Sequence, residues 1–305
     1  MQATILREIQ LPNLPSASGV EVVGEMVYII GDDAPLLYCF DARELTAGQP
    51  VTLFETAHFS AGRIPKGLKP DLECLTAVPA PDGGTALLAL GSGATAAREV
   101  GYWVTLSGPA PATASVYPLS LTPLYQLLRA KLPAGLTLNL EAAASTADSL
   151  LLMQRSVGMA TGNLVFHCPL ASTLDFIRHR TVRAPAIGVQ EYALPHIDGK
   201  PAGLSGAVGF EGQLFVTASV EDTTDPVADG AVLGSFVGVL DAQPRSARPL
   251  PVALARLQRP DGQPYRGKVE GVAVRRRLGP GRYELLLVTD DDAGGSTAVE
   301  VELRV

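Results

Sequence analysis

A short phrase that recurs five times along the chain constrains the fold most strongly. In its last copy, a strand-like run from Lys268 to Val274 contains Glu270 and precedes a second, more apolar run that ends at Asp290. The earlier copies also place a glutamate or a serine at the start of such a run. The five phrase residues are Ser18, Glu73, Glu141, Ser205 and Glu270. A phrase repeated at similar intervals is the signature of a repeat architecture.

The spacing of the phrase predicts the number of repeats. Successive phrase residues are separated by 55 to 68 residues, and each interval holds four strand-like runs bounded by turn residues such as Asp82-Gly83. Four antiparallel strands make one blade of a β-propeller. The last repeat ends one strand short, whereas residues 3–11 form a strand-like run with no repeat of their own. We therefore predict an all-β, five-bladed β-propeller whose last blade is closed by the N-terminal strand, which leaves no open sheet edge.

The repeats account for the whole chain, so we expect one propeller domain over residues 1–305. The predicted segments are a closure strand at 3–11 and blades at approximately 18–56, 71–120, 138–195, 203–258 and 268–305. A helix is predicted at Pro123–Lys131, because Pro lies in its first turn and its apolar side chains share one face. The polar stretch Thr173–Arg183 is predicted to be an insertion before the last strand of the third blade.

Charge and hydropathy limit the partners that we expect. The net charge of −7 disfavours nucleic acid and anionic membranes, which require a basic surface. No apolar run approaches the length of a membrane span. The first nine residues carry charge where a secretion signal needs an apolar core, so we expect a cytoplasmic protein, or an exported one if a leader has been removed. Cys39, Cys74 and Cys168 lack metal-ligand spacing and are expected to be buried free thiols.

In a propeller, the phrase residues would meet at one mouth of the central channel. The first strand of each blade lines the channel, so five equivalent strand starts form a ring at similar height. Three carboxylates brought that close repel one another unless their pKa values rise or a cation lies among them. Because every phrase residue offers oxygen, the ring favours a hard cation, Ca²⁺ before Mg²⁺. The other interpretation is that these glutamates are solvated residues beside loops.

The phrases also resemble those of a known family. The runs Lys66–Glu73, Leu204-Ser205-Gly206 and Val269–Val272 look like blade openings of the calcium-activated nucleotidases (secreted apyrases with five blades), and of uncharacterised bacterial propellers that resemble phytase-like esterases. In the nucleotidases, serine and glutamate from successive blades hold a calcium ion. The resemblance implies that Ser18, Glu73, Glu141, Ser205 and Glu270 are the metal ligands here. This chain differs from the nucleotidases at Leu140, where they have a histidine. They also have an Asp-bearing segment before the first blade, whereas this chain starts at the closure strand.

Charged residues near the ends of the second strands could complete a site at the same mouth. Lys66, Arg98 and Arg155 are placed to bind a small anionic ligand that bridges to the cation, and Asp290 is a candidate base. The sequence carries no nucleophile elbow, P-loop or dinucleotide fingerprint. Three functions remain open: a metal-dependent hydrolase of phosphoesters or phosphoanhydrides, a non-catalytic binding propeller in which the ion is structural, and a glycosidase with two suitably spaced carboxylates.

Overall fold

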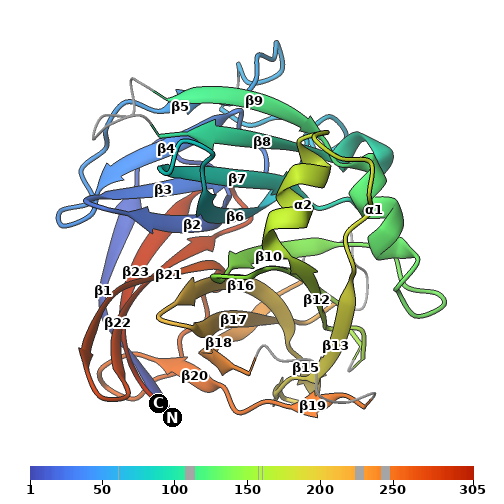
Figure 1. The fold of residues 1–305 in the computed structure, drawn as a ribbon. Helices are drawn as coiled ribbons and strands as arrows, with labels where there is room; N and C mark the ends of the chain where they lie inside the picture. The colour runs from blue at the N-terminus through green and yellow to red at the C-terminus, as the bar shows by residue number, and fades with distance from the viewer. Residues whose placement is uncertain (61, 107–113, 157, 160, 224–229, 242–247) are drawn as a thin grey trace.

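The protein is all-β, and its sheets are arranged around a central axis (Figure 1). The computed structural model describes residues 1–305 except 61, 107–113, 157, 160, 224–229 and 242–247. Among the described residues, strand pairing gives successive antiparallel units, the last of which takes the N-terminal strand as its outer strand and is joined through that strand to the unit before it. The predicted propeller class is therefore confirmed.

The first two units follow the pattern of the first two repeats. Each consists of consecutive antiparallel strands, of which the first lies nearest the axis. The first unit contains β2 (Ala17–Val23), β3 (Met26–Gly31), β4 (Leu36–Asp41) and β5 (Val51–Thr52). The second unit contains β6 (Leu72–Pro79), β7 (Thr85–Gly91), β8 (Val100–Thr105) and β9 (Ser115–Ser120), with a 3₁₀ turn at Ala96–Arg98.

The third and fourth units carry short additional strands. The third unit contains β10 (Leu140–Ser145), β11 (Ser149–Gln154), β12 (Leu164–Pro169) and β13 (Gly188–Ala193), and β13 also pairs with β19 (Leu250–Pro251). The fourth contains β16 (Gly203–Phe210), β17 (Gln213–Glu221), β18 (Val232–Leu240) and β20 (Ala255–Gln258). A separate hairpin joins β14 (His196–Ile197) to β15 (Lys200–Pro201).

The N-terminal strand completes the fifth unit, as the repeat count predicts. This unit contains β21 (Lys268–Gly279), β22 (Arg282–Asp290) and β23 (Ser296–Arg304). Strand β1 (Gln2–Leu11) pairs antiparallel with β23 along its whole length, from Gln2 opposite Arg304 to Leu11 opposite Ser296. Ala3, Ile5 and Leu11 are buried, so this strand contributes to the core as well as covering a sheet edge.

Two helices lie outside the sheets, and one of them corrects the sequence interpretation. Helix α1 (Thr122–Arg129) has Pro near its start and buries Leu124, Tyr125 and Leu128, as predicted. The stretch Thr173–Arg183 is not simply a polar insertion, because its first part belongs to helix α2 (Leu170–Ile177). Leu170, Leu174 and Ile177 are buried at helical spacing against the core between the second and third units. The polar residues between them obscured this stripe.

Glycines allow the inner strands to approach closely around the axis. A Cβ atom added to Gly206 on β16 would lie 2.9 Å from the Cα atom of Gly271 on β21, and one added to Gly271 would lie 3.1 Å from Cγ1 of Val20 on β2. Real Cβ atoms do not tolerate the first of these distances, so a side chain at Gly206 would push the two strands apart. The close approach narrows the channel below the phrase residues.

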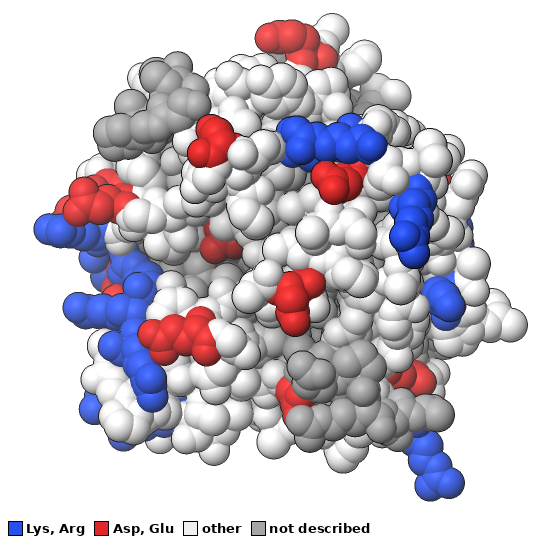
Figure 2. Space-filling model, in the orientation of Figure 1, with Lys and Arg blue, Asp and Glu red and all other residues white. Residues whose placement is uncertain are grey.

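The surface charges, the helix lengths and the state of the cysteines can each be set beside the sequence predictions. Positive and negative side chains are interspersed over the face shown in Figure 2. No described helix is both long and apolar enough to cross a membrane. The three cysteines are buried and form no disulfide, as expected.

Candidate functional site

All five phrase residues occupy a β-bulge at the start of an inner strand. In each unit, the pairing between the first and second strands skips one residue of the first strand. The skipped residues are Ser18, Glu73, Glu141, Ser205 and Glu270. A bulge places an unpaired residue in a bent strand and redirects its side chain. The recurrence of one bulge at one position explains why the phrase repeats, and it turns the strand starts toward the axis.

Four of the five phrase residues line one small central cavity. Ser18, Glu73, Glu141 and Glu270 face a space of about 10 Å³, which is close to the room that one water molecule needs. Ser205 is fully buried, and its hydroxyl lies 3.3 Å from the hydroxyls of both Thr217 and Ser219 on the neighbouring strand. The described structure therefore gathers the three glutamates and Ser18 but directs Ser205 into its own blade.

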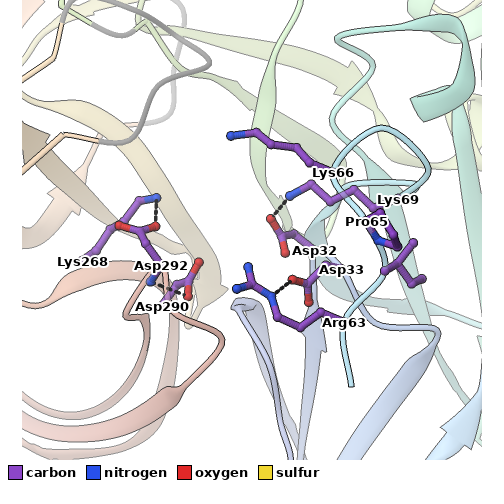
Figure 3. Close-up of a pocket in the computed structure, with 10 residues that line it drawn as sticks. Asp32, Asp33, Arg63, Pro65, Lys66, Lys69, Lys268, Asp290 and Asp292 are labelled. Carbon is purple, nitrogen blue, oxygen red and sulfur yellow. Dashed lines mark hydrogen bonds and ion pairs between the residues drawn. The ribbon is translucent and has the colours of Figure 1, made fainter. Parts of the chain in front are cut away.

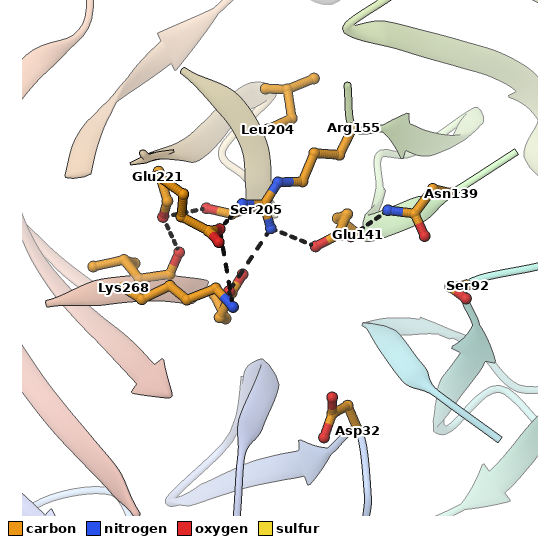
Figure 4. A network of polar contacts seen from close by, with 12 residues as sticks. Asp32, Ser92, Asn139, Glu141, Arg155, Leu204, Ser205, Glu221 and Lys268 are labelled. Carbon is orange, nitrogen blue, oxygen red and sulfur yellow. Dashed lines mark hydrogen bonds and ion pairs between the residues drawn. The ribbon is translucent and has the colours of Figure 1, made fainter. Parts of the chain in front are cut away.

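A buried arginine supplies positive charge to this ring (Figure 4). Arg155 follows β11, and its Nη1 atom lies 3.1 Å from Oε2 of Glu141 and 3.8 Å from Oε1 of Glu270. Its Nη2 atom donates to Glu221 at the end of β17. The guanidinium thus joins carboxylates of three blades. Arg155 was predicted to bind a substrate anion, and the structure shows it bound to these glutamates and only 7% exposed.

Lys268 extends the same network toward the channel mouth. Its Nζ atom lies 3.2 Å from Oε1 of Glu270, 3.9 Å from Oε1 of Glu221 and 3.0 Å from Oδ1 of Asp292. Even with these cations, burial raises the pKa of Glu270 to about 8. Its Oε2 atom is buried without a hydrogen-bond partner among the described residues. The ring of phrase glutamates therefore lacks either a positive charge or a hydrogen-bond donor at Oε2 of Glu270.

A second group of carboxylates lies on the wall formed by the first two blades. One oxygen from each of Asp32, Asp71 and Glu73 lies within 4.8 Å of the others. Lys69 pairs with Asp32 and lies 3.1 Å from Oδ1 of Asp71. The other oxygen of Asp71 accepts hydrogen bonds from Ser92 at 2.5 Å and from Arg98 at 2.6 Å. In Figure 4, Asp32 lies apart from the network around Arg155.

The backbone and the pKa values at this wall indicate an unusual environment. Asp71 has φ 57°, a left-handed conformation that costs energy for a non-glycine residue and is common at functional sites. Burial and the neighbouring Asp71 and Glu141 raise the pKa of Glu73 well above its ordinary value. Burial also raises the pKa of Asp32 to about 7, although Lys69 opposes this shift. These carboxylates would gain from a further cation.

A pocket of about 270 Å³ opens above this wall (Figure 3). Its lining is almost entirely charged and consists of Asp32, Asp33, Arg63, Ile64, Pro65, Lys66, Lys69, Lys268, Asp290 and Asp292. Arg63 donates to Oδ2 of Asp33 at 2.5 Å, whereas Oδ1 of Asp33 is buried without a partner among the described residues. Burial raises the pKa of Asp290 to about 6. The pocket thus combines cations with carboxyl groups that titrate near neutral pH.

The four residues predicted to bind substrate lie in different places: two line the pocket and two pair with carboxylates. Lys66 and Asp290 line the pocket, as expected for ligand contacts. Arg98 holds Asp71, and Arg155 lies in the central network, so both position carboxylates in this structure. These two contacts are between protein groups, and the predicted substrate roles of all four residues remain predictions.

Sequence reasoning missed several residues that build the site. Asp71, Asn139 and Lys268 each stand two positions before a phrase residue, and Asn139 donates to Oε1 of Glu141 at 2.5 Å. Ser16 holds the same position in the first repeat and donates to Asp33 at 3.2 Å. Alignment of the repeats on the phrase residue would have shown this second polar column in four of the five, the exception being Gly203. Glu221 and Lys69 stand among the charged residues that the sequence places near the same mouth, but the sequence does not signal that they pair with Arg155 and Asp32.

Several solved structures are similar to this chain, and the first of those that follow supports the fold. The glutaminyl cyclase of Myxococcus xanthus aligns with a TM-score of 0.50 and 12% identity, covering 99% of this chain and 97% of that one. The Kuenenia stuttgartiensis hydrazine synthase gives a TM-score of 0.43 at 14% identity over 91% of this chain and 78% of that one. The β-propeller domain of Cps50 (Swd1) from Myceliophteria thermophila gives 0.41 at 8% identity, with 96% and 99% covered.

Sequence comparison assigns the chain to a family without assigning an activity. No curated protein matches it in sequence. A family of unknown function matches residues 13–303, which is nearly the full length and includes all five phrase residues. The chain therefore belongs to the family of unknown function DUF6929.

Proposed function

We propose that the channel mouth binds a hard divalent cation, calcium in the first instance, and uses it to hydrolyse a small phosphorylated anion held in the adjoining pocket. One observation carries this proposal: oxygens of Asp32, Asp71 and Glu73 converge within 4.8 Å, and Asp32 also lines the 270 Å³ pocket. Carboxylate oxygens at such spacing suit Ca²⁺ or Mg²⁺. The resemblance of the blade openings to calcium-activated nucleotidases supports the same chemistry.

The raised pKa values and the unpartnered oxygens of these carboxylates favour binding of a cation. Burial raises the pKa of both Glu73 and Asp32, which means that their charged forms lack compensation. Oδ1 of Asp32 is buried without a hydrogen-bond partner among the described residues, as is Oδ1 of the neighbouring Asp33, whose side chain is 2% exposed. These free oxygens face a wall that opens into the pocket. A cation would satisfy them and lower the pKa values.

The ligand set that we propose shares Glu73 with the sequence prediction and shifts the ion toward blades one and two. A cation placed midway between Glu141 and Glu270 would meet the guanidinium of Arg155, because Nη1 is already 3.1 Å and 3.8 Å from their oxygens. Two like charges at such range repel by several kcal/mol at an intermediate dielectric. In this proposal Ser18, Glu141 and Glu270 line the neighbouring central cavity without binding the ion, and Ser205 stays within its own blade.

The chain's own residues can divide the remaining work of hydrolysis. When bound, the cation would polarise a phosphoryl oxygen or acidify a water molecule. Arg63 and Lys66 lie on the pocket wall, where cations would bind the substrate's negative charge. Asp290 lines the same pocket and has its pKa raised to about 6, so it is largely deprotonated at neutral pH and can accept a proton from water.

The test combines cation binding with turnover. Calcium binding would be measured by calorimetry, and hydrolysis with p-nitrophenyl phosphate, ATP and UDP, each with calcium or with chelator. Glu73→Gln should weaken calcium binding by about tenfold or more, since it removes one charged ligand. Glu25→Gln is the matched control, because the Glu25 side chain is 81% exposed and pairs with Arg43 at the surface. Unchanged calcium affinity in Glu73→Gln would refute the site.

A non-catalytic propeller with a structural ion is the second candidate. The observation that favours it is the pairing of cations with carboxylates in and below the pocket. Arg63 pairs with Asp33, Lys69 with Asp32, and Lys268 with Glu270, so several cations are already engaged within the protein. A cation that binds only the folded state stabilises it by mass action. A melting temperature that depends on calcium, with no turnover of the three substrates, would favour this candidate.

A further inference from the structure

A second cavity lies away from the channel, on the outer side of the second blade. It has a volume of about 480 Å³, within the range of small-molecule sites. The outer strands β8 and β9 form one wall, and the residues that follow helix α2 form the other. The lining residues are Pro81, Asp82, Trp103, Thr105, Tyr117, Pro118, Leu119, Arg178, His179 and Arg180. Three basic residues in sequence thus face two aromatic ones.

The end of helix α2 holds these basic residues in a defined geometry. The amide of Arg180 donates to the carbonyl of Asp175 at 2.8 Å, and the amide of His179 donates to Phe176 at 3.1 Å. This is the pattern of a Schellman cap, whose left-handed position is usually glycine. Here that position is His179, with φ 55°. A histidine kept in this costly conformation is consistent with a functional constraint on the segment.

Arg178 makes no ion pair with a carboxylate among the described residues, although Asp175, three positions earlier, acts on its charge. Its guanidinium carbon lies 4.3 Å from the ring centroid of Trp103, which is a cation–π contact. Burial and the neighbouring Arg180 lower the pKa of Arg178. Arg180 makes only a 4.0 Å contact with Asp175, and both of those side chains are about half exposed. The carboxylate of Asp82, also in the lining, accepts a hydrogen bond from Gly84 in its own turn.

The aromatic wall offers a surface and an unused donor. The side chain of Tyr117 is an exposed aromatic group on the edge strand, with 55% of the residue accessible. Trp103 is almost fully buried, and its Nε1 atom has no hydrogen-bond partner among the described residues. A planar ligand in the cavity would find an aromatic surface on Tyr117, beside the contact of Arg178 with Trp103.

We propose that this cavity binds a small organic anion that carries a planar apolar group, such as an aromatic carboxylate. The guanidinium of Arg178, which lies over the Trp103 ring, binds the carboxylate through its fork of N–H donors. Arg180 adds positive charge, and Tyr117 packs against the planar group. This site is independent of the channel mouth, since it uses none of the channel residues.

Trp103 allows a direct test because it is the single tryptophan of the chain. We would titrate the full-length protein with benzoate and follow tryptophan emission together with the single indole N–H resonance in a ¹H–¹⁵N spectrum. Benzamide, which has the same ring without the charge, is the matched ligand. The proposal expects saturable changes with benzoate and binding of benzamide weaker by about tenfold or more. Equal binding of the two ligands, or no saturable change with benzoate, would overturn it.

Variants separate a built site from general surface attraction. Arg178→Gln should weaken benzoate binding by about tenfold, and Tyr117→Ala should weaken it less, since that residue contributes packing only. Arg276→Gln is the control, because its side chain is 69% exposed and it pairs with Glu284 on the fifth blade. Circular dichroism and melting temperature would show that each variant is folded. If folded Arg178→Gln and Tyr117→Ala both bind benzoate as the control does, the site is not the one proposed.

Discussion

Nη1 of Arg155 donates a hydrogen bond of 3.1 Å to Oε2 of Glu141, so a guanidinium lies inside the ring of carboxylates around the propeller axis. The same side chain reaches Glu221 and Glu270 on the next two blades. The guanidinium therefore supplies part of the positive charge that a metal ion would otherwise supply to these carboxylates. The arrangement joins blades three, four and five through one residue.

Removal of this guanidinium should destabilise the protein strongly. Arg155→Met would leave Glu141 without its cation and Glu221 and Glu270 with Lys268 alone, and breaking a buried ion pair on one side typically costs about 3–5 kcal/mol. Urea unfolding monitored by circular dichroism would measure the loss. Calcium should restore part of it if the ring can accept an ion in place of the guanidinium. A loss below about 1 kcal/mol would show that the network contributes little.

Stability should fall as the pH rises through neutrality. Burial raises the pKa of Glu270 from 4.5 to about 8, so between these values the folded protein keeps a proton that the unfolded chain has released. Its contribution to stability is full below pH 4.5 and is lost as pH rises toward about 8. One proton corresponds to a slope of at most about 1.4 kcal/mol per pH unit.

Glu270→Gln should flatten this pH dependence, because the amide does not titrate. Unfolding free energies at several pH values between 5 and 8 would compare the two proteins, with chelator present to exclude bound cations. Asp32 and Asp290, whose pKa values burial raises to about 7 and about 6, contribute to the slope in the same direction. A variant with the same slope as the parent would contradict the raised pKa of Glu270.

Lys69 should compete with a divalent cation for the carboxylates of the first two blades. Its ammonium group already pairs with Asp32 and lies 3.1 Å from Asp71. Lys69→Met removes this resident positive charge, so calcium affinity measured by calorimetry should rise, by about tenfold for a gain of 1.4 kcal/mol. Lower or unchanged affinity would place the cation elsewhere or show that none is bound.

Close packing of the inner strands should make Gly206 intolerant of any side chain. In Gly206→Ala the new Cβ atom would lie 2.5 Å from Oγ1 of Thr217 and 2.9 Å from Cα of Gly271, so the strands must separate. Overpacking of this kind costs about 1–3 kcal/mol. Gly279→Ala is the matched control, since nothing lies within 4 Å of its added Cβ. Equal stability of the two variants in urea would contradict the narrow channel.

The N-terminal strand should contribute to stability through its buried face. Ile5 is 2% exposed in the core of the fifth blade, and Ile→Ala substitution at a buried site costs about 2–5 kcal/mol. Leu6, the next residue, is 53% exposed, so Leu6→Ala should change stability by no more than about 0.5 kcal/mol. Similar effects at both positions would mean that the strand does not pack as described.

Repeats and turns were readable from the sequence because they depend on neighbouring residues. Alternation of apolar side chains, turn residues such as those around Gly83, and the recurring glutamate each report a local preference. The missing last strand and the unmatched first strand together predicted the pairing of β1 with β23, which the structure confirms. The α2 helix was missed because polar residues interrupt its buried stripe of Leu170, Leu174 and Ile177.

By itself, the sequence determined the propeller class and the closure by the first strand, and it singled out Ser18, Glu73, Glu141 and Glu270, which line the central cavity, together with Ser205, which does not. Only the tertiary structure decided which charges become neighbours: each phrase residue lies at a bulge, four of the five line the central cavity, and Arg155 reaches Glu221 on the next blade. The physical reason is the separation along the chain of the residues that determine each feature. Strand patterns and turns are set by residues a few positions apart, whereas the pairing of buried charges depends on loops and bulges brought together from distant parts of the chain.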